Sequence, residues 1–391
     1  MTRKFYVMIM LMIALLPVLA ACGGETATTT AVPVAATNTT AAAAPTNTTA
    51  AAAPTTAAAP TTAAAGQPFT IGISNPFISS EYRTQMIQEL IDTNKEYMDK
   101  GVTTALEIES ADTDVAGQIQ QLQNLINKGV DAILVNPGDV NGLNATLQEA
   151  IGKGIIVISV DQELATPNVY NVGIDQKQWA KTSAQWLADK LGGKGTIVEI
   201  EGFPGHPANE ARMSGVGEVL AKYPDIKVLG KDTGKWDEAT GQQVMSNFLA
   251  SFPTMDGYWT QDGMAIGAFQ AALAANPTKF PVPVLEARCQ ALQLWDARLK
   301  ADPTFESIAV ANQPGVSPTG LRIAVNMLMG KQVDKSKLGG ANGLSFVLPV
   351  AVTVTKDNFQ QVYAEQCTGK PPAYLLDHIL TDAEVQQYFT K

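Results

Sequence analysis

The sequence contains few residues in arrangements that could carry out catalysis. Residues 192–196 have the composition of a phosphate-binding loop, but Lys194 is followed by Gly195 instead of Ser or Thr. The segment also precedes a predicted strand, so we interpret it as the end of a helix. His206 lies in a Gly/Pro-rich loop and His378 lies near the C-terminus, and neither has a partner close in sequence. The motifs of serine hydrolases (Gly-x-Ser-x-Gly) and zinc proteases (His-Glu-x-x-His) are both missing from the sequence.

Carboxylates are abundant, with 37 Asp and Glu residues, and some directly follow apolar segments that we expect to be strands. A carboxylate in that position could act as a general acid or base. It could equally well accept hydrogen bonds from the hydroxyl groups of a ligand. Because the catalytic motifs are missing and the chain has only two histidines, we expect no catalytic residues, no metal site and no cofactor.

Cys22 follows a segment with the features of an export signal. Arg3 and Lys4 precede an apolar run over residues 5–19, and small residues lead to a cleavage site. The run is too short for a secure transmembrane helix. The sequence Leu-Ala-Ala-Cys resembles the bacterial lipobox, in which the cysteine is acylated and becomes the first residue. We therefore expect a signal peptide over residues 1–21 and an extracytoplasmic protein anchored to the cell membrane by lipid alone; a plain signal peptide with a chance cysteine is the alternative.

Residues 22–68 are expected to form a disordered stalk. Between Gly23 and Pro68 the chain consists almost entirely of Ala, Thr, Pro and Asn, with Glu25 as the only charge. These side chains bury too little apolar surface to offset the conformational entropy lost on folding.

Two further cysteines, Cys289 and Cys367, lie in the part of the chain expected to fold. Outside the cytosol two such cysteines are expected to pair as a structural disulfide. Two separate buried thiols are the alternative.

The chain has 27 basic and 37 acidic residues and a formal net charge of −10. This charge excludes a nucleic-acid binder, because that class of protein needs a basic face.

From Phe69 onward, apolar strand patterns alternate with helical patterns. Residues 132–135 are entirely apolar and residues 155–160 almost entirely so, as in strands of a parallel sheet covered by helices on both faces. Two successive runs of such units predict an α/β fold with two doubly wound, Rossmann-like lobes. Ligands of these sheets bind outside the carboxyl ends of the strands, so a cleft between the lobes is the expected site.

Residues 118–139 (QIQQLQNLINKGVDAILVNPGD) strongly resemble the type I periplasmic binding proteins, in particular the ribose-binding branch of the sugar receptors of ABC importers. The likeness continues in order through shorter segments: residues 154–161, 172–175, 202–205, 212–215 and 262–268. It implies two lobes joined by a three-crossing hinge, with the ligand bound between them. Matching the crossings places lobe one at residues 69–173 and 312–340, and lobe two at residues 174–311 and 341–391.

The resemblance also implies ligand contacts in lobe one. Asn75 and Phe77 follow the first strand, where the family has a polar group and an aromatic side chain against the sugar ring. Asp161 ends the fourth strand, where the family uses Asp-Arg to bind hydroxyl groups. Here Gln162 replaces the arginine, so one planar array of charged donors is missing.

The remaining implied contacts lie in lobe two and at the last crossing: Arg212, Trp236, Gln261, Asp262, Glu286 and Asn312. Glu286 stands near the position of a family aspartate, and Asn312 near that of a family glutamine. These departures argue against ribose as the specific ligand.

The resemblance implies a solute-binding lipoprotein that binds a monosaccharide or a similar polyhydroxylated molecule by hinge closure, without catalysis. Its partners would be an ABC permease and ATPase, and we expect a monomer. A receptor that presents its ligand to a signalling partner is the alternative; a secreted hydrolase is a third class, without a motif in its favour.

Overall fold

A computed structural model describes residues 66–390. The predicted signal peptide over residues 1–21, the predicted lipidation site Cys22 and most of the predicted stalk lie outside the described residues. Within residues 66–390, the helices are all too short or too polar to cross a lipid bilayer.

The first sheet has six parallel strands in the order β11-β5-β4-β3-β1-β2. Alternate side chains of β3 are buried on opposite faces of this sheet, Leu134 on one face and Ile133 on the other. Both faces must therefore be covered by helices. The strands are β1 (Ile71–Asn75), β2 (Glu107–Ser110), β3 (Ala132–Val135), β4 (Ile156–Val160), β5 (Tyr170–Ile174) and β11 (Ser345–Leu348).

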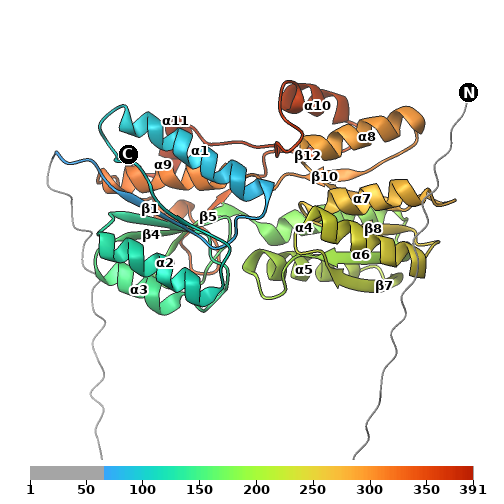
Figure 1. The fold of residues 1–391 in the computed structure, drawn as a ribbon, viewed down its shortest axis with the longest axis horizontal. Helices are drawn as coiled ribbons and strands as arrows, with labels where there is room; N and C mark the ends of the chain where they lie inside the picture. Colours follow the sequence, from blue (N-terminus) through green and yellow to red (C-terminus); the bar gives the residue numbers. More distant parts are fainter. Residues whose placement is uncertain (1–65, 391) are drawn as a thin grey trace, which may run out of the picture. The chain divides into compact units, whose positions relative to one another are not determined.

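Four helices cover the two faces of the first sheet. Helices α1 (Glu81–Met98) and α9 (Val316–Leu328) lie on one face, and α2 (Val115–Lys128) and α3 (Asn144–Gly152) lie on the other (Figure 1). Local residues set the ends of α2: the Asp114 carboxylate accepts a hydrogen bond from the Gly117 amide, and Gly129 ends the helix with a φ of 72°.

The second sheet also has six strands, in the order β12-β10-β9-β8-β6-β7. Only β12 runs antiparallel to its neighbour. The strands are β6 (Lys194–Glu201), β7 (Asp225–Thr233), β8 (Gly257–Trp259), β9 (Val282–Glu286), β10 (Ile308–Val310) and β12 (Thr353–Val354).

Helices again cover both faces of the second sheet. They are α4 (Gln176–Lys190), α5 (Pro207–Leu220), α6 (Glu238–Ser251), α7 (Met264–Ala275), α8 (Cys289–Ala301) and α10 (Phe359–Cys367). Gly192 and Gly193 follow α4 with positive φ angles of 65° and 75°, and β6 begins directly after them. The prediction that this glycine-rich segment ends a helix is confirmed.

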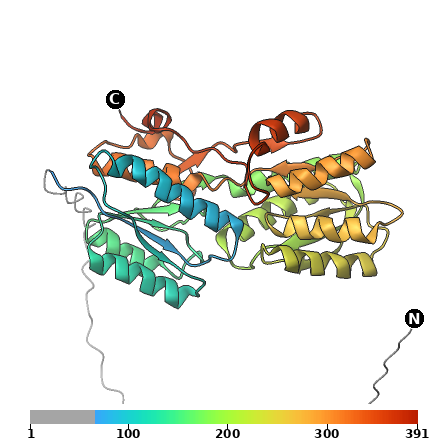
Figure 2. The ribbon, with the colours of Figure 1, turned by 45° about the horizontal axis from the view of Figure 1, so that its top comes forward.

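The expected two-lobed α/β fold is confirmed, with one lobe built on each sheet. The chain passes between the lobes after β5, after β10 and between β11 and β12. The segment that follows α10 then returns to the first lobe, where α11 (Asp382–Val385) packs against α9 (Figure 2). Two short 3₁₀ helices, η1 (Lys335–Lys337) and η2 (Gln386–Tyr388), complete the elements of the described residues.

The predicted assignment of residues 341–391 to the second lobe is wrong at both ends. Strand β11 pairs with β5 in the first sheet, and α11 packs against a helix of the first lobe. Residues 346–354 are almost entirely apolar, but Pro349 within them has no amide hydrogen for a sheet ladder. Its carbonyl instead accepts a hydrogen bond from the Gln313 side chain at 2.8 Å, and β12 on its far side belongs to the second sheet.

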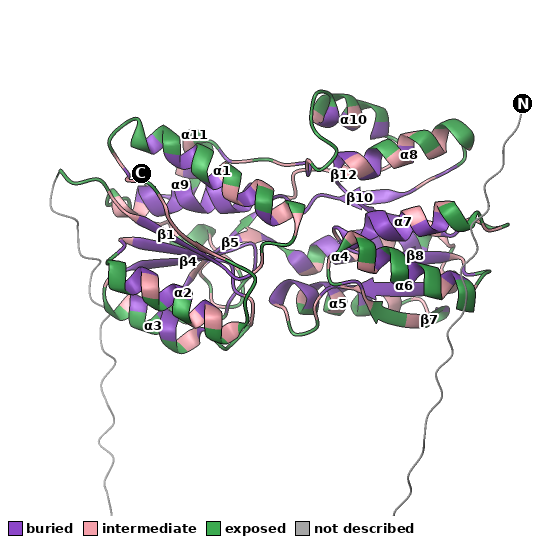
Figure 3. Cartoon of the chain, in the orientation of Figure 1, coloured by how far each residue is buried: buried purple, intermediate pink, exposed green. Residues whose placement is uncertain are grey.

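The strands of both sheets are mostly buried, while the helices expose their outer faces (Figure 3). Each sheet thus works as a rigid support for the loops at its edge. The carboxyl ends of several strands in both lobes lead into residues that line one cavity.

Candidate functional site

A cavity lies between the two lobes. Its lining side chains follow the carboxyl ends of strands from both sheets, as expected for doubly wound folds. Phe77 follows β1, Asp161 follows β4, Trp236 follows β7 and Asp262 follows β8. The other lining residues are Ser80, Glu81, Tyr82, Arg83, Gln162, His206, Ala208, Arg212, Gly263, Glu286 and Asn312.

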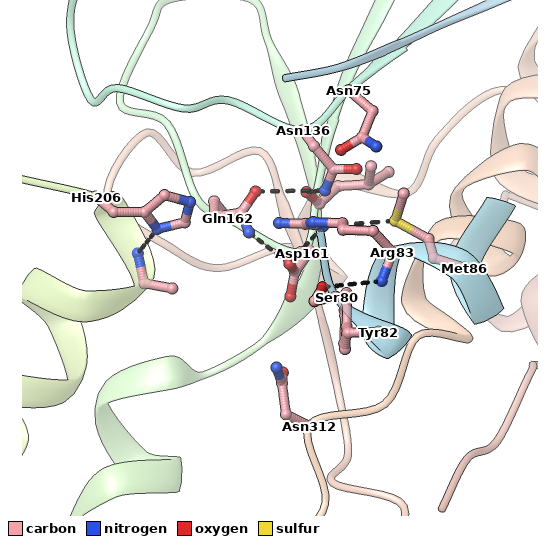
Figure 4. Close-up of polar contacts among 12 residues, drawn as sticks. Asn75, Ser80, Tyr82, Arg83, Met86, Asn136, Asp161, Gln162, His206 and Asn312 are labelled. Atoms are coloured by element: carbon pink, nitrogen blue, oxygen red, sulfur yellow. Dashed lines mark hydrogen bonds and ion pairs between the residues drawn. The ribbon is translucent and has the colours of Figure 1, made fainter. Parts of the chain in front are cut away.

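Asp161 and Arg83 form a buried ion pair on the wall contributed by the first lobe. The Arg83 Nη1 atom lies 3.0 Å from Asp161 Oδ2, and the side chains are 8% and 5% exposed. The Gln162 amide also donates to this carboxylate (Figure 4). Asp161 has a φ of 70°, in the left-handed region that non-glycine residues seldom adopt. Helix α1 thus supplies a guanidinium beside Gln162, the residue that replaces the arginine of the related sugar receptors.

Gln176, the first residue of α4, connects both lobes through its side-chain amide. Its Nε2 atom donates to the Asp161 carbonyl at 3.3 Å and to Asn312 Oδ1 at 3.2 Å. Its Oε1 atom accepts from Arg212 Nε at 2.9 Å. Asp161 belongs to the first lobe, Arg212 to the second and Asn312 to a crossing between them. One buried amide therefore joins all three.

Arg212 is the central cation of the second lobe's wall. Its guanidinium lies 4.3 Å from the centre of the Trp179 ring and donates to Gln261 Oε1 at 2.9 Å. It also forms an ion pair with Asp262, whose carboxylate accepts a further hydrogen bond from Asn312 Nδ2 at 3.3 Å. Arg212 is 1% exposed, so these partners fix its orientation.

The Trp236 ring is held by a constrained loop and a close glycine. Lys235 and Trp236 have positive φ angles of 54° and 53°, a conformation that costs roughly 1–3 kcal/mol per residue. The ring packs so closely on Gly202 that a Cβ atom there would lie 2.2 Å from Trp236 Cε2. The indole N–H donates to Gln261 Oε1 at 3.0 Å. The strain and the close contact together fix the plane of the indole.

Aromatic side chains of the two lobes meet beside the cavity. The ring centres of Phe77 and Phe203 are 5.6 Å apart, with an edge-to-face geometry, and Phe203 contacts Trp236 at 5.4 Å. Phe77 belongs to the first lobe and the other two to the second. Apolar ring surfaces from both lobes are therefore next to the charged groups.

Glu286 ends β9 and faces the buried guanidinium of Arg288, with Nε and Oε2 2.8 Å apart. Burial raises the pKa of the Glu286 carboxyl to about 7, although the Arg288 charge opposes this shift.

Of the ten residues proposed for ligand contact, eight line the cavity: Phe77, Asp161, Gln162, Arg212, Trp236, Asp262, Glu286 and Asn312. Gln261 does not line it; its side chain positions Arg212 and Trp236. Asn75 is also behind the lining, where its Nδ2 atom donates to Ser110 Oγ at 2.9 Å. Whether the eight lining residues contact a ligand stays a prediction.

The lining residues that were not singled out from the sequence include Arg83, Tyr82 and His206. The pKa of Tyr82 is raised well above its ordinary value by burial and by the Asp161 charge. Burial and the nearby arginines lower the pKa of His206 to about 3, so both side chains are neutral at pH 7. The position of Tyr82 and Arg83, in the first turn of the helix after β1, was the signal available in the sequence.

His206, for which the sequence offers no partner close along the chain, makes one local contact and one contact with Trp236. Its Nδ1 atom accepts from the Ala208 amide at 3.3 Å, and its ring packs edge-on against Trp236 at 4.7 Å. It caps α5 and supports the indole.

Outside the cavity, Cys289 and Cys367 form a disulfide that joins the start of α8 to the end of α10. Within residues 66–390, no cluster of His, Cys, Asp and Glu side chains has the arrangement of a metal site.

Comparisons with known proteins all find solute-binding proteins that are similar to this chain. Residues 71–332 match the family model of the periplasmic binding protein domain. A xylitol-binding protein of Mycolicibacterium smegmatis is 34% identical over 312 residues, which cover 78% of this chain and 82% of that protein. A ribose import binding protein of Bacillus subtilis is 27% identical over 271 residues, covering 68% of this chain and 84% of the relative.

Among solved structures, an ABC transporter solute binding protein from Thermobispora bispora has the same fold. The TM-score is 0.71 at 23% sequence identity, and the match covers 81% of this chain and 94% of that one.

Proposed function

The chain belongs to the periplasmic binding protein family, in its ribose-binding branch, and from this premise we propose that it is the solute receptor of an ABC importer for a monosaccharide or polyol. The relatives bind xylitol and ribose by name, and both are small polyhydroxylated molecules. The family places the protein outside the cytoplasm.

The observation that carries this proposal is the combination of aromatic surface and paired polar groups in one interlobe cavity. Phe77 and Trp236 offer ring faces to the C–H side of a sugar or polyol. Asp161 and Asp262 can accept from ligand hydroxyls, and Arg83 and Arg212 can donate to ligand oxygens. Because each charge is already paired, a neutral ligand suits the site better than an ion.

Binding is proposed to work through hinge closure. Contacts from both lobes are complete only when the lobes are together, so a ligand between them shifts the population toward the closed state. The interlobe hydrogen bonds of Gln176 support this mechanism. This mechanism requires no catalytic step.

A thermal-shift screen of sugars and polyols tests the function. Xylitol, ribose, arabinose and myo-inositol belong in the first panel, together with acidic and basic amino acids as a contrast. We expect a hydroxylated compound to raise the melting temperature, because a ligand that binds only the folded protein stabilises it. Stabilisation by amino acids alone would contradict the proposal.

Trp236→Ala and Arg212→Ala test the assigned cavity with the compound selected in that screen. We expect each to weaken binding at least about tenfold, the equivalent of about 1.4 kcal/mol, by loss of ring contact and of a buried donor. Isothermal titration calorimetry measures the affinity, and the melting temperature without ligand controls for folding. Wild-type affinity in both variants would place the site elsewhere.

We also propose that the mature protein is a monomer anchored through an acylated Cys22 beside its permease. Two acyl chains give stable membrane attachment without a transmembrane helix. Fractionation of cells that carry Cys22→Ala tests the anchor. We expect the variant protein in the soluble fraction.

A further inference from the structure

A cluster of four charged side chains lies between the lobes next to the cavity. Arg288, at the start of α8, is 1% exposed and faces three carboxylates. Its Nη1 atom lies 2.9 Å from Glu81 Oε2, its Nε atom 2.8 Å from Glu286 Oε2 and its Nη2 atom 3.5 Å from Glu238 Oε2. A buried guanidinium keeps its charge, so these pairs offset its desolvation.

The partners of Arg288 come from both lobes. Glu286 ends β9 and Glu238 begins α6, both in the second lobe, whereas Glu81 begins α1 in the first lobe. If the lobes separate, Arg288 keeps two partners and loses the third. The pair with Glu81 therefore depends on the arrangement of the lobes.

The C-terminal segment supports a second interlobe contact at the same place. The Cys289 amide donates to the Tyr374 carbonyl and the Leu376 amide to the Ala287 carbonyl, both at 2.9 Å. These bonds and the disulfide of Cys289 with Cys367 fix the segment beside Arg288 in the second lobe.

Gln85 of α1 binds this fixed segment with both ends of its amide. Gln85 Oε1 accepts from the Leu375 amide at 2.9 Å, and Nε2 donates to the Leu375 carbonyl at 3.2 Å. Glu81 and Gln85 are one helical turn apart, so the same face of α1 makes both contacts. Arg288 and Gln85 do not line the cavity.

We propose that Glu81–Arg288 and Gln85–Leu375 form an interlobe latch that stabilises the closed arrangement and so raises ligand affinity independently of any contact with the ligand. Arg288 and Gln85 are positioning residues in this scheme. The effect on affinity rests on the proposed function, but the effect on the lobes does not. Because affinity scales with the fraction of closed protein, weakening the latch lowers affinity even with every ligand contact intact.

The first test compares Glu81→Gln with Glu96→Gln in ligand-free protein by small-angle X-ray scattering. Glu96 pairs with Arg322 at 2.9 Å, also between a half-exposed carboxylate and a buried guanidinium, but within the first lobe. We expect Glu81→Gln to increase the radius of gyration and Glu96→Gln to leave it unchanged. Equal radii in wild type and Glu81→Gln would overturn the latch, whether or not any sugar binds.

Because Glu81 lines the cavity, Gln85→Ala provides a second variant that leaves the lining intact. Its control is Gln88→Ala, since Gln88 is exposed and bonds only to Asp92 within α1. With the compound selected by thermal shift, we expect Glu81→Gln and Gln85→Ala each to weaken affinity about 3–10-fold, mainly through faster dissociation. Wild-type affinity in Gln85→Ala would overturn the proposal, and absence of binding by the wild type would reject the proposed function alone.

Discussion

Glu89 and Asp377 bring two carboxyl groups together where the C-terminal segment meets α1. Glu89 Oε2 and Asp377 Oδ2 are both buried and have no hydrogen-bond partner within the described residues. The second Asp377 oxygen accepts from the Gly315 amide at 2.8 Å, at the start of α9. One proton shared between the carboxyls would satisfy both oxygens.

This pair predicts a stability that falls as the pH rises. Burial and the Asp377 charge raise the pKa of Glu89 from 4.5 to about 9, and burial also raises the pKa of Asp377. The folded protein therefore keeps a proton that the unfolded chain loses above pH 4.5. Its stabilising contribution is complete below that pH and is lost as the pH rises toward 9.

Glu89→Gln should remove most of this dependence, because the amide N–H₂ can donate to Asp377 at every pH. We expect the variant's melting temperature at pH 8.5 to exceed that of the wild type by about 1–2 °C, the change produced by ~1 kcal/mol in a chain of this size. Melting curves from pH 5 to pH 9 measure it. Parallel pH profiles of the two proteins would contradict a shared proton.

At the residue scale, the sequence and its resemblance to a known family identified most of the predicted cavity residues, but not the side chains that pair with them. Asp161, Trp236 and Asp262 occupy family positions, so their places could be predicted. Arg83 and Gln176 could not, because each lies within a helix whose rotation is set by packing against distant strands. Their role depends on contacts 78 and 36 residues away along the chain, Arg83 to Asp161 and Gln176 to Arg212.

At the element scale, periodicity was sufficient for the two sheets but not for the C-terminal segment. Short apolar strands between amphipathic helices predict doubly wound sheets. A two-residue strand such as β12 carries no comparable pattern. The chain crosses from the first sheet to the second near Pro349, between β11 and β12, and no local pattern marks this crossing. Strand pairing over such distances is a tertiary property, which local propensity does not determine.

The disulfide stabilises two of these C-terminal elements. It joins α8 to α10 across 78 residues, and a loop of this length predicts up to about 4 kcal/mol of stabilisation by restricting the unfolded chain. The sulfur atoms lie in a cluster with Trp295 and Phe359, so the bridge is well covered.

Replacing Cys289 and Cys367 together by Ser should lower the free energy of unfolding by about 2–4 kcal/mol. Urea denaturation monitored by tryptophan fluorescence measures the change. Reductant should destabilise the wild type to a similar extent and leave the double variant unaffected. An unchanged urea midpoint in the double variant would show that α10 is held by packing alone.

At the scale of the whole molecule, Gln176 links the two lobes and the hinge. Its amide binds the end of β4 in the first lobe, Arg212 in the second lobe and Asn312 in the crossing after β10. It is buried, with 7% of its surface exposed. An amide with three partners in three parts of the chain couples the position of Arg212 to that of Asp161.

Gln176→Ala should therefore weaken binding of the sugar or polyol selected by thermal shift. The substitution leaves Arg212 Nε without its partner, and a lost hydrogen bond to a charged group costs about 1.5–3 kcal/mol, which corresponds to roughly 10–150-fold in affinity. Gln178→Ala is the matched control, because Gln178 lies on the exposed side of the same helix turn. Titration calorimetry gives the affinity, and scattering with and without ligand gives the extent of closure. If Gln176→Ala binds and closes like Gln178→Ala, the lobes are coupled by the ligand and the latch rather than through this amide.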